Sequence, residues 1–253
     1  MQSQQSRRIP LSDRVIQGVA LRAKRPDHAA AGGARRMVRT SHHPVLPMPL
    51  ITEVTAQHVD RWAEHLERIF LESGREGTPL FSPYETSPSA SSPEGRSRYE
   101  KRFALPVKSP GWGRAWTIDD ADGRAIAHLD LVGSVIPSEM HRATLGIGCE
   151  RAFCRQGYGR AMMRHAVDFV VDNGIEWIDL HVFNENDVAI ALYRSFGFVE
   201  TGRSVDRFRL RGRSVDDVTM SLRVSPSQNA AAYGTNPRTE PRIRSGNTPD
   251  TTR

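Results

Sequence analysis

The sequence predicts a single α/β domain built on a mixed sheet, flanked by two tails that have little to bury. Three observations support this: strand-like and helix-like segments alternate through the middle of the chain, an Asp-Gly pair joins two strands, and both ends lack apolar periodicity. The 253 residues are 38% apolar and include 20 glycines, which is usual for a globular protein. We therefore expect a folded domain over 48–224 and disordered segments over 1–47 and 225–253.

The elements follow from apolar spacing and from turn residues. Residues 58–72 repeat apolar side chains at helical spacing, and Gly74 is a plausible stop. Residues 82–95 are rich in Ser and Pro, which predicts an exposed loop. The pair Asp122-Gly123 predicts a tight hairpin turn. The expected strands are 50–55, 114–118, 124–132, 142–149, 175–183, 198–210 and 215–222, and the expected helices are 58–72, 96–104, 158–172 and 186–196.

The positive charge of the chain belongs to its two tails. Residues 1–45 hold nine Lys or Arg against two Asp, and residues 225–253 hold four Arg against two acidic residues. Because the formal net charge is +6, the part between these tails carries −3. A fold that binds nucleic acid is expected to show a basic stripe on its folded part, so we do not expect nucleic acid as a partner. For the arginine-rich N-terminus we favour a solvated tail, or an upstream start codon with Met37 or Met48 as the real beginning, over a targeting segment or a nucleic-acid-binding arm.

Three features of the sequence bear on where the protein works. No stretch approaches the roughly 18–20 uninterrupted apolar residues of a membrane span. The N-terminus also lacks the charged start and apolar region of a secretion signal. The two cysteines, Cys149 and Cys154, are too few for a disulfide framework or a zinc cage. We therefore expect a cytoplasmic protein that uses no membrane and no metal.

The most informative segment is a Gly-Tyr-Gly turn at residues 157–159, where a predicted strand gives way to a helix. Glycine lets the backbone come close to a ligand, and the unpaired N–H groups of a helix N-terminus attract an anion such as a pyrophosphate. Arg155 and Arg160 lie at this turn and can add charge-assisted contacts. A dinucleotide-binding loop does not fit, because Met162 occupies the third glycine position, and the Gly-Lys-Ser/Thr ending of a P-loop is absent.

A second motif completes the pattern. Residues 184–198 read NENDVAIALYRSFGF, and residues 154–163 read CRQGYGRAMM. Together they resemble the GNAT superfamily of acetyl-CoA-dependent N-acetyltransferases, which share a [QR]-x-x-G-x-[GA] pyrophosphate loop and an N-x-x-A-x-x-L-Y-x-x-x-G-F helix. The resemblance covers residues 50–222 and is most specific over 143–198. It implies a mixed, mostly antiparallel sheet of seven strands flanked by helices.

This resemblance implies that acetyl-CoA is a co-substrate. Cysteine replaces the family's Gln or Arg at the first loop position, so we expect weaker or shifted phosphate contacts there. The pantetheine arm is expected along the strand before the loop, with the thioester carbonyl near the backbone N–H of Cys149. Asn186 is expected to help hold the cofactor, to cap its helix, or both. The implied acetyl-CoA-binding residues are Ile147, Gly148, Cys149, Cys154, Arg155, Gln156, Gly157, Tyr158, Gly159, Arg160 and Asn186.

The resemblance also implies a general acid, whereas the general base stays open. Tyr193 matches the family tyrosine that protonates the departing thiolate; the alternative is a packed ring with its hydroxyl at the surface. His181 lies twelve residues earlier. In the branch that acetylates ribosomal-protein N-termini, that position resembles a glutamate base, and an imidazole is competent near neutral pH. Glu150, at the end of the cofactor strand, is a rival base, as are His141 and Asp130.

We predict an N-acetyltransferase that moves the acetyl group of acetyl-CoA directly to a primary amine of a small molecule, such as an amino acid. The charge of −3 suits a cationic acceptor, and Asp216 or Asp217 can meet an ammonium, although turn and edge roles fit equally well. The alternatives are a protein N-terminal acetyltransferase of the ribosomal-protein type and a non-catalytic acetyl-CoA-binding regulatory module. The identity of the amine and the oligomeric state, including a homodimer, stay open.

Overall fold

The computed structural model describes residues 49–84 and 90–224, and these form a seven-stranded mixed sheet with helices on both faces. The strand order is β1-β2-β3-β4-β5-β7-β6; β4 and β5 run parallel, and the other neighbours are antiparallel. The predicted sheet is confirmed. The expected tails lie outside the described residues. The strands are β1 Ile51–Glu53, β2 Gly113–Asp119, β3 Ala125–Gly133, β4 Arg142–Cys149, β5 Trp177–Phe183, β6 Val199–Leu210 and β7 Arg213–Arg223.

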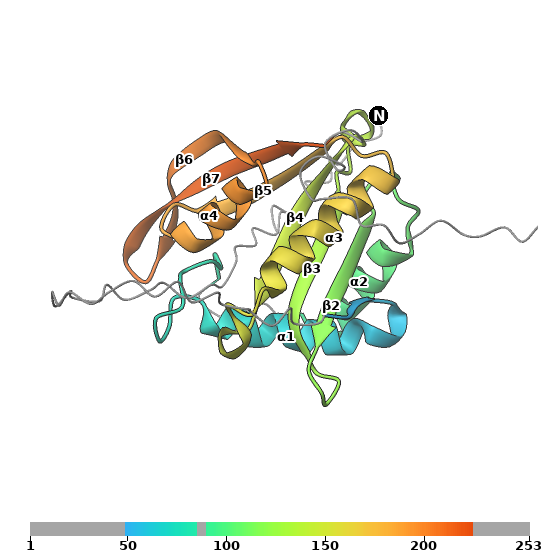
Figure 1. Cartoon of the computed structure of the whole chain (residues 1–253), viewed down its shortest axis with the longest axis horizontal. Helices are drawn as coiled ribbons and strands as arrows, with labels where there is room; N and C mark the ends of the chain where they lie inside the picture. Colours follow the sequence, from blue (N-terminus) through green and yellow to red (C-terminus); the bar gives the residue numbers. More distant parts are fainter. Residues whose placement is uncertain (1–48, 85–89, 225–253) are drawn as a thin grey trace, which may run out of the picture.

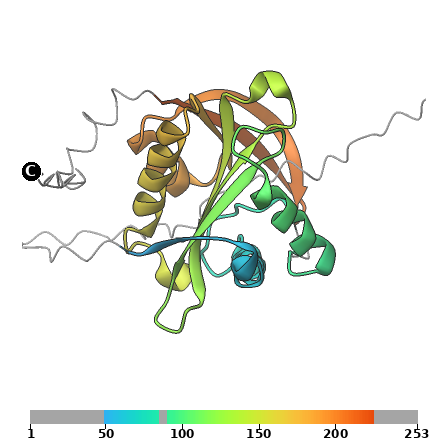
Figure 2. The ribbon, with the colours of Figure 1, turned by 90° about the vertical axis from the view of Figure 1, so that its right-hand side faces the viewer.

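Four α-helices cover the sheet within the described part of the chain. Helices α1 (Val59–Glu72) and α2 (Pro93–Ala104) lie on one face, and α3 (Tyr158–Asp172) and α4 (Asp187–Ser195) lie on the other (Figure 2). Each helix buries its apolar side against the sheet, as its spacing of apolar residues predicts. No helix in residues 49–84 or 90–224 is long and apolar enough to cross a membrane.

The loop predicted over 82–95 is partly wrong. Ser82 and Ala90 are buried, and α2 begins at Pro93 rather than at residue 96. The Ser92 side chain accepts a hydrogen bond from the backbone N–H of Gly95, at 3.1 Å. A serine followed by proline at the first helical position is a helix start, so the last residues of this Ser/Pro-rich segment had a local reason to become helical.

The centre of the sheet opens between two neighbouring strands. Strands β4 and β5 pair only where residues 142–144 lie opposite residues 177–179. Beyond that point β5 diverges from β4 towards the β6–β7 hairpin (Figure 1). Residues 145–149 therefore pair with β3 on one side only, within the part of the chain that the structure describes.

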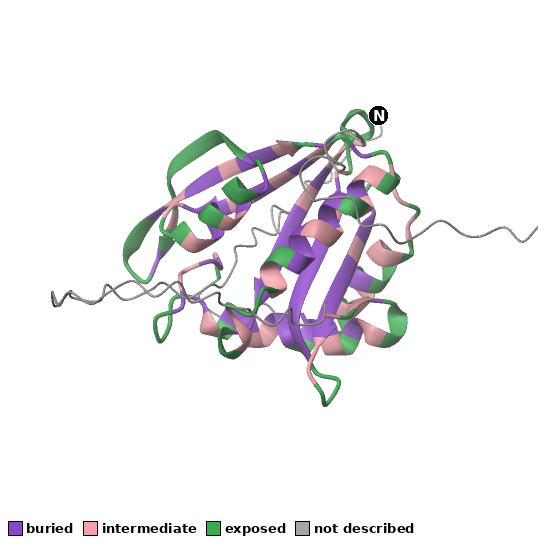
Figure 3. Cartoon of the chain, in the orientation of Figure 1, coloured by how far each residue is buried: buried purple, intermediate pink, exposed green. Residues whose placement is uncertain are grey.

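Burial is deepest on the β3–β4 side of this opening. Strands β3 and β4 are buried along most of their length, whereas β6 is largely exposed (Figure 3). The open stretch of β4 is thus an interruption of backbone pairing at the middle of the sheet. Backbone N–H and C=O groups in such a place need partners, which a bound extended ligand can supply.

Candidate active site

The N-terminus of α3 is prepared for an anion. Gly157 precedes the helix with φ of +87°, in the left-handed region that favours glycine. No side chain caps this helix end among the described residues. The first N–H groups of α3, with the positive end of its dipole, therefore face outward without a capping oxygen. This geometry fits the sequence-based prediction of a pyrophosphate site.

A groove of about 570 Å³ lies beside this helix end. Four predicted residues line it, namely Gln156, Gly157, Tyr158 and Arg160. Arg164, one turn further along α3, lines it as well, and so do Asp119 and Asp120 at the end of β2. The groove thus has basic residues from α3 and acidic residues from the end of β2.

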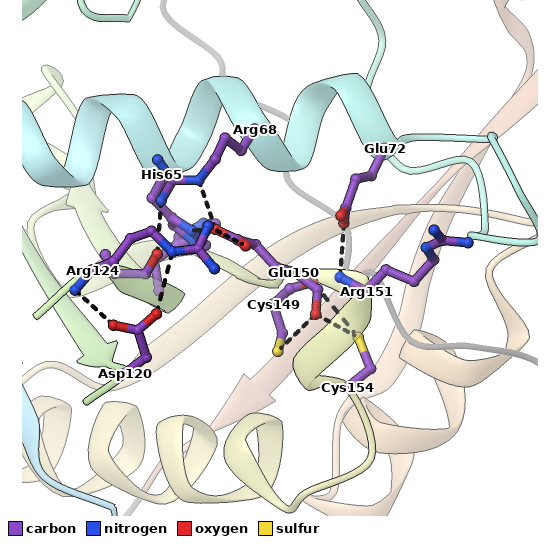
Figure 4. Close-up of polar contacts among 11 residues, drawn as sticks. His65, Arg68, Glu72, Asp120, Arg124, Cys149, Glu150, Arg151 and Cys154 are labelled. Atoms are coloured by element: carbon purple, nitrogen blue, oxygen red, sulfur yellow. Dashed lines mark hydrogen bonds and ion pairs between the residues drawn. The ribbon is translucent and has the colours of Figure 1, made fainter. Parts of the chain in front are cut away.

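Cys149 ends β4, and Cys154 lies between β4 and α3 with its sulfur directed toward Cys149 and Glu150 (Figure 4). Cys154 Sγ donates to the carbonyl oxygens of Glu150, at 3.4 Å, and of Cys149, at 3.6 Å. A hydrogen bond with Cys154, together with burial, raises the pKa of the Cys149 thiol. Cys149 is therefore a protonated, buried thiol rather than a nucleophile, and its contribution to a ligand site is its backbone.

The backbone of β4 directs two donors into the opening. The N–H of Glu150 donates to Ile126 O of β3, at 2.9 Å. Because hydrogen-bonding direction alternates along a strand, the N–H groups of Cys149 and Ile147 point away from β3. They point to the side that β5 has left. This is the position expected for the pantetheine arm and the thioester carbonyl.

Asn186 fixes the start of α4. Its side chain is fully buried and accepts a hydrogen bond from the backbone N–H of Ala189, at 3.2 Å, as a helix N-cap does. The capping role that the sequence predicted is confirmed. By fixing the first turn, Asn186 also sets the direction in which the rest of α4 carries its side chains.

Tyr193 is the unusual side chain of α4. It is fully buried, and its hydroxyl has no hydrogen-bond partner within the described part of the chain. Burial raises the pKa of this phenol well above its usual value. The hydroxyl therefore keeps its proton at neutral pH. It is also buried, whereas the alternative interpretation, a packed ring, placed the hydroxyl at the surface. A buried donor without an acceptor suits a proton that is used only when a ligand is present.

His181 on β5 pairs with an aspartate of the neighbouring strand β7. Its Nδ1 lies 2.8 Å from Asp217 Oδ2, and the aspartate side chain is 2% exposed. Arg207 Nε lies 3.6 Å from the same oxygen. The carboxylate fixes the proton of His181 on Nδ1, so Nε2 is the free basic nitrogen. Asp216, by contrast, accepts from the backbone N–H of Asp206, at 2.9 Å, which is a structural role in the hairpin.

Glu150 belongs to a cluster of polar side chains that includes His65 and Arg68 of α1 (Figure 4). Arg68 Nε donates to it at 2.8 Å, Arg124 Nη1 lies 3.1 Å away, and His65 Nδ1 lies 3.2 Å away. Burial works in the opposite direction, but the hydrogen bonds from His65 and Arg68 lower the pKa of Glu150. A carboxylate held by two guanidinium groups is a weak direct base.

The remaining rival bases lie apart from each other. His141 is exposed and precedes β4, at the opposite end of the strand from Glu150. Asp130 is buried on β3, opposite Gly146 of the open stretch. Of the two, only Asp130 lies next to the opening. No group of three or more His, Cys, Asp or Glu in residues 49–84 and 90–224 is arranged to hold a metal ion.

Two buried histidines were not identified from the sequence as candidate functional residues. His65 of α1 and His128 of β3 are hydrogen bonded to each other, with His65 Nε2 3.0 Å from His128 Nδ1. A signal was present, because His65 falls at helical spacing between Trp62 and Ile69 on the apolar face of α1. A histidine on such a face needs a buried partner, but sequence alone does not say which residue provides it.

Comparisons with known proteins agree with this geometry. Residues 80–198 match the model of the acetyltransferase (GNAT) family. The [ribosomal protein bS18]-alanine N-acetyltransferase of Escherichia coli K12 is 33% identical over 87 residues, which is 34% of this chain and 59% of the relative. A spermidine N(1)-acetyltransferase of Vibrio cholerae is 32% identical over 106 residues, which is 41% of this chain and 59% of the relative.

A solved structure shares the fold. It is a GNAT superfamily phosphinothricin acetyltransferase from Sinorhizobium meliloti in complex with AcCoA, with a TM-score of 0.59 and 17% identity. The match covers 70% of this chain and 89% of that protein. In sequence, the chain spans less than two thirds of the length of the curated relatives reported above, at 59% of each.

Proposed function

Because the chain belongs to the GNAT acetyltransferase family, we propose that it transfers the acetyl group of acetyl-CoA directly to a primary amine of a small molecule. One observation carries the proposal. The unpaired stretch of β4, residues 145–149, leads to the uncapped N-terminus of α3, so a single extended ligand with an anionic end can satisfy both.

The residues present fit acetyl-CoA, which supplies an activated acetyl group on a thioester. The N–H groups of Ile147 and Cys149 are oriented to donate hydrogen bonds to the amide carbonyls of the arm and to the thioester carbonyl. The first N–H groups of α3, together with Arg155 and Arg160, are suited to the pyrophosphate. The thiol of Cys154 donates to the carbonyl oxygen of Glu150. This loop therefore relies on backbone amides, whereas the family pattern has Gln or Arg, a longer polar side chain, at the position of Cys154.

Two side chains are proposed to move protons. Tyr193, whose buried hydroxyl retains its proton, protonates the departing thiolate. His181, oriented by Asp217, takes a proton from the ammonium of the acceptor through Nε2. His181 is half-buried, with 26% of its side chain exposed, so it can release that proton to solvent.

A protein N-terminal amine is the second candidate acceptor. It is favoured by the 33% identity to the [ribosomal protein bS18]-alanine N-acetyltransferase of Escherichia coli. An α-amino group of pKa about 7.7–8.0 also needs less help from a base than a lysine amine does. A non-catalytic binding module has less support, because it gives no reason for a buried hydroxyl without a partner at Tyr193.

The test measures amine-dependent release of CoA from acetyl-CoA by the full chain. The acceptor panel contains amino acids, polyamines and short peptides with free N-termini. We expect one class of amine to raise the rate well above the hydrolysis seen without an acceptor. Binding of acetyl-CoA with no acceleration by any amine would favour the binding module. A lack of acetyl-CoA binding would contradict the proposed function altogether.

A further inference from the structure

The β6–β7 hairpin carries an irregularity close to His181. Between Ser204 and Phe208 the pairing of β6 with β7 shifts register, so residues 205–207 of β6 lie opposite a single residue of β7. Such a bulge interrupts regular pairing and redirects a side chain, and bulges are frequent beside active sites. In this hairpin the last residue of the bulge is Arg207.

Hydrogen bonds hold the bulge in one conformation. Asp206 has φ of +52°, in the left-handed region that few non-glycine residues adopt. Its backbone N–H donates to Asp216 Oδ1 at 2.9 Å, and its carboxylate accepts from Ser214 Oγ and from Arg209. A residue stays in this backbone conformation only where its surroundings hold it there. The bulge therefore fixes the direction of Arg207, the next residue.

Arg207 and Asp217 form an incomplete ion pair. Arg207 Nε lies 3.6 Å from Asp217 Oδ2, and the guanidinium lies over the ring of Phe208. Among the described residues, no second carboxylate lies within ion-pair distance of this guanidinium. The other oxygen of the aspartate, Oδ1, is buried and has no hydrogen-bond partner in the same part of the chain. The pair thus leaves two guanidinium nitrogens and one buried carboxylate oxygen for a ligand.

Another arginine shows what a complete pair looks like in this fold. Arg142 of β4 places two nitrogens 2.7 Å and 2.5 Å from the two oxygens of Asp179. Its fork and the carboxylate satisfy each other, as in a structural pair. Arg207 and Asp217 meet through one nitrogen and one oxygen only, so structural stabilisation does not account for the orphaned Oδ1.

Asp217 links the incomplete pair to the proposed base. His181 Nδ1 and Arg207 Nε both contact Asp217 Oδ2, so the imidazole and the guanidinium flank one carboxylate. The neighbouring Val182 and Val218 pack in the core that also contains the buried side chains of α4. Because side chains alternate along a strand, His181 and Asp217 face away from α4. Solvent reaches that side, since 26% of the His181 side chain and 37% of the Arg207 side chain are exposed.

We infer that Arg207 and Asp217 select an α-amino acid as the acceptor, an inference that deepens the proposed function and rests on it. An α-amino acid carries an ammonium and a carboxylate on one carbon atom, so it can satisfy both halves of the incomplete pair. The guanidinium of Arg207 binds the α-carboxylate, which its planar fork matches. The ammonium lies on the side of Asp217 and His181, where His181 Nε2 takes its proton.

This arrangement distinguishes the candidate classes of acceptor. A peptide N-terminus has an amide in place of the α-carboxylate, so it leaves the guanidinium without an anion. A polyamine has no carboxylate and brings a further cation towards the arginine. A site built to bind a polar group of its substrate selects against analogues that lack that group. We therefore expect free α-amino acids to be better acceptors than peptides or polyamines.

The test compares each common L-amino acid with its α-amide as the acceptor, with acetyl-CoA and the full chain. The two compounds share the α-amine and the side chain, but the amide lacks the anionic group. We expect kcat/KM for at least one amino acid to exceed that of its amide about tenfold or more, mainly through KM. Equal or higher kcat/KM with the amides, or with polyamines, would overturn the inference.

A substitution tests the arginine itself. Arg207→Gln should raise KM for the amino acid about tenfold or more and leave kcat/KM for the amide within about twofold. The matched control is Arg203→Gln, because Arg203 lies on β6 outside the bulge, is 42% exposed and pairs with Glu200. It should change neither value. An equal loss with amino acid and amide in Arg207→Gln would contradict recognition of the carboxylate. Where Arg207→Gln does not fold, the comparison on the unaltered chain decides.

The outcomes separate this inference from the function on which it rests. If the chain acetylates amines without preferring those that carry an α-carboxylate, the inference is wrong and the proposed function stands. If it acetylates no amine, the proposed function fails, and calorimetry with the same compounds in the presence of CoA decides the inference. Binding of an amino acid but not of its amide would support it, and the absence of such a difference would overturn it.

Discussion

At the scale of single residues, the buried hydroxyl of Tyr193 lowers the stability of the fold, whereas the proposed reaction requires it. Its hydroxyl is buried without a partner among the described residues, and an unsatisfied buried polar group costs about 1–3 kcal/mol. Tyr193→Phe removes that group and keeps the packing of the ring. We therefore expect the melting temperature to stay constant or rise, while kcat falls about a hundredfold with acetyl-CoA affinity unchanged. Thermal unfolding, calorimetry and initial rates measure the three quantities.

Tyr99 offers a matched control for this substitution. It is a buried tyrosine of α2 that packs against Trp62, on the other face of the sheet from α4. Tyr99→Phe should leave kcat within about twofold of the unaltered chain. A Tyr193→Phe variant that acetylates amines as fast as the parent would remove tyrosine from the proton transfers.

At the scale of elements, the start of α3 depends on one backbone conformation. Gly157 has φ of +87°, and a Cβ there would meet nothing within 4 Å, so substitution introduces strain without a clash. We expect Gly157→Ala to cost about 1–2 kcal/mol of unfolding free energy and to weaken acetyl-CoA binding about tenfold, because a shifted turn redirects the first N–H groups of α3. Urea unfolding and calorimetry measure the two effects.

The control for this element is Gly212 in the β6–β7 turn. It has φ of +73°, and a Cβ there would also meet nothing within 4 Å. Gly212→Ala should lose a similar amount of stability and keep acetyl-CoA affinity. Equal losses of affinity in both variants would mean that the Gly157 effect is general destabilisation rather than a local change at the anion site.

The elements themselves were largely predictable from sequence, because each carries its own signal. The bounds of β4 and α3 agree with prediction, and the glycine turn marks the start of α3. The start of α2 was missed because its Ser-Pro signal lay inside a segment whose composition favours loops. Local patterns therefore fix where elements lie, and compositional averages can hide a start signal.

At the scale of the whole molecule, contacts between distant elements were beyond sequence reasoning. The divergence of β4 from β5 has no local signal in the sequence, because strand pairing depends on packing between distant elements. The pairs His181–Asp217 and His65–Glu150 join residues 36 and 85 positions apart. Their members were visible as chemistry-bearing residues, but the fold selects which of them meet.

The buried histidines make the stability of the whole molecule depend on pH. Burial lowers the pKa of His65 and His128 in the folded state, whereas in the unfolded chain both titrate near 6.5. Below that pH the unfolded state binds more protons, so the unfolding free energy falls as the pH falls, by up to about 1.4 kcal/mol per pH unit for each histidine. The urea concentration at the unfolding midpoint, measured from pH 8 to pH 5, should decrease once the pH is below 6.5. In His128→Gln this decrease per pH unit should be smaller. His141→Gln, at an exposed position, should leave the slope unchanged. A flat profile would mean that these histidines titrate alike in the folded and unfolded states, and would contradict the lowered pKa of the buried rings.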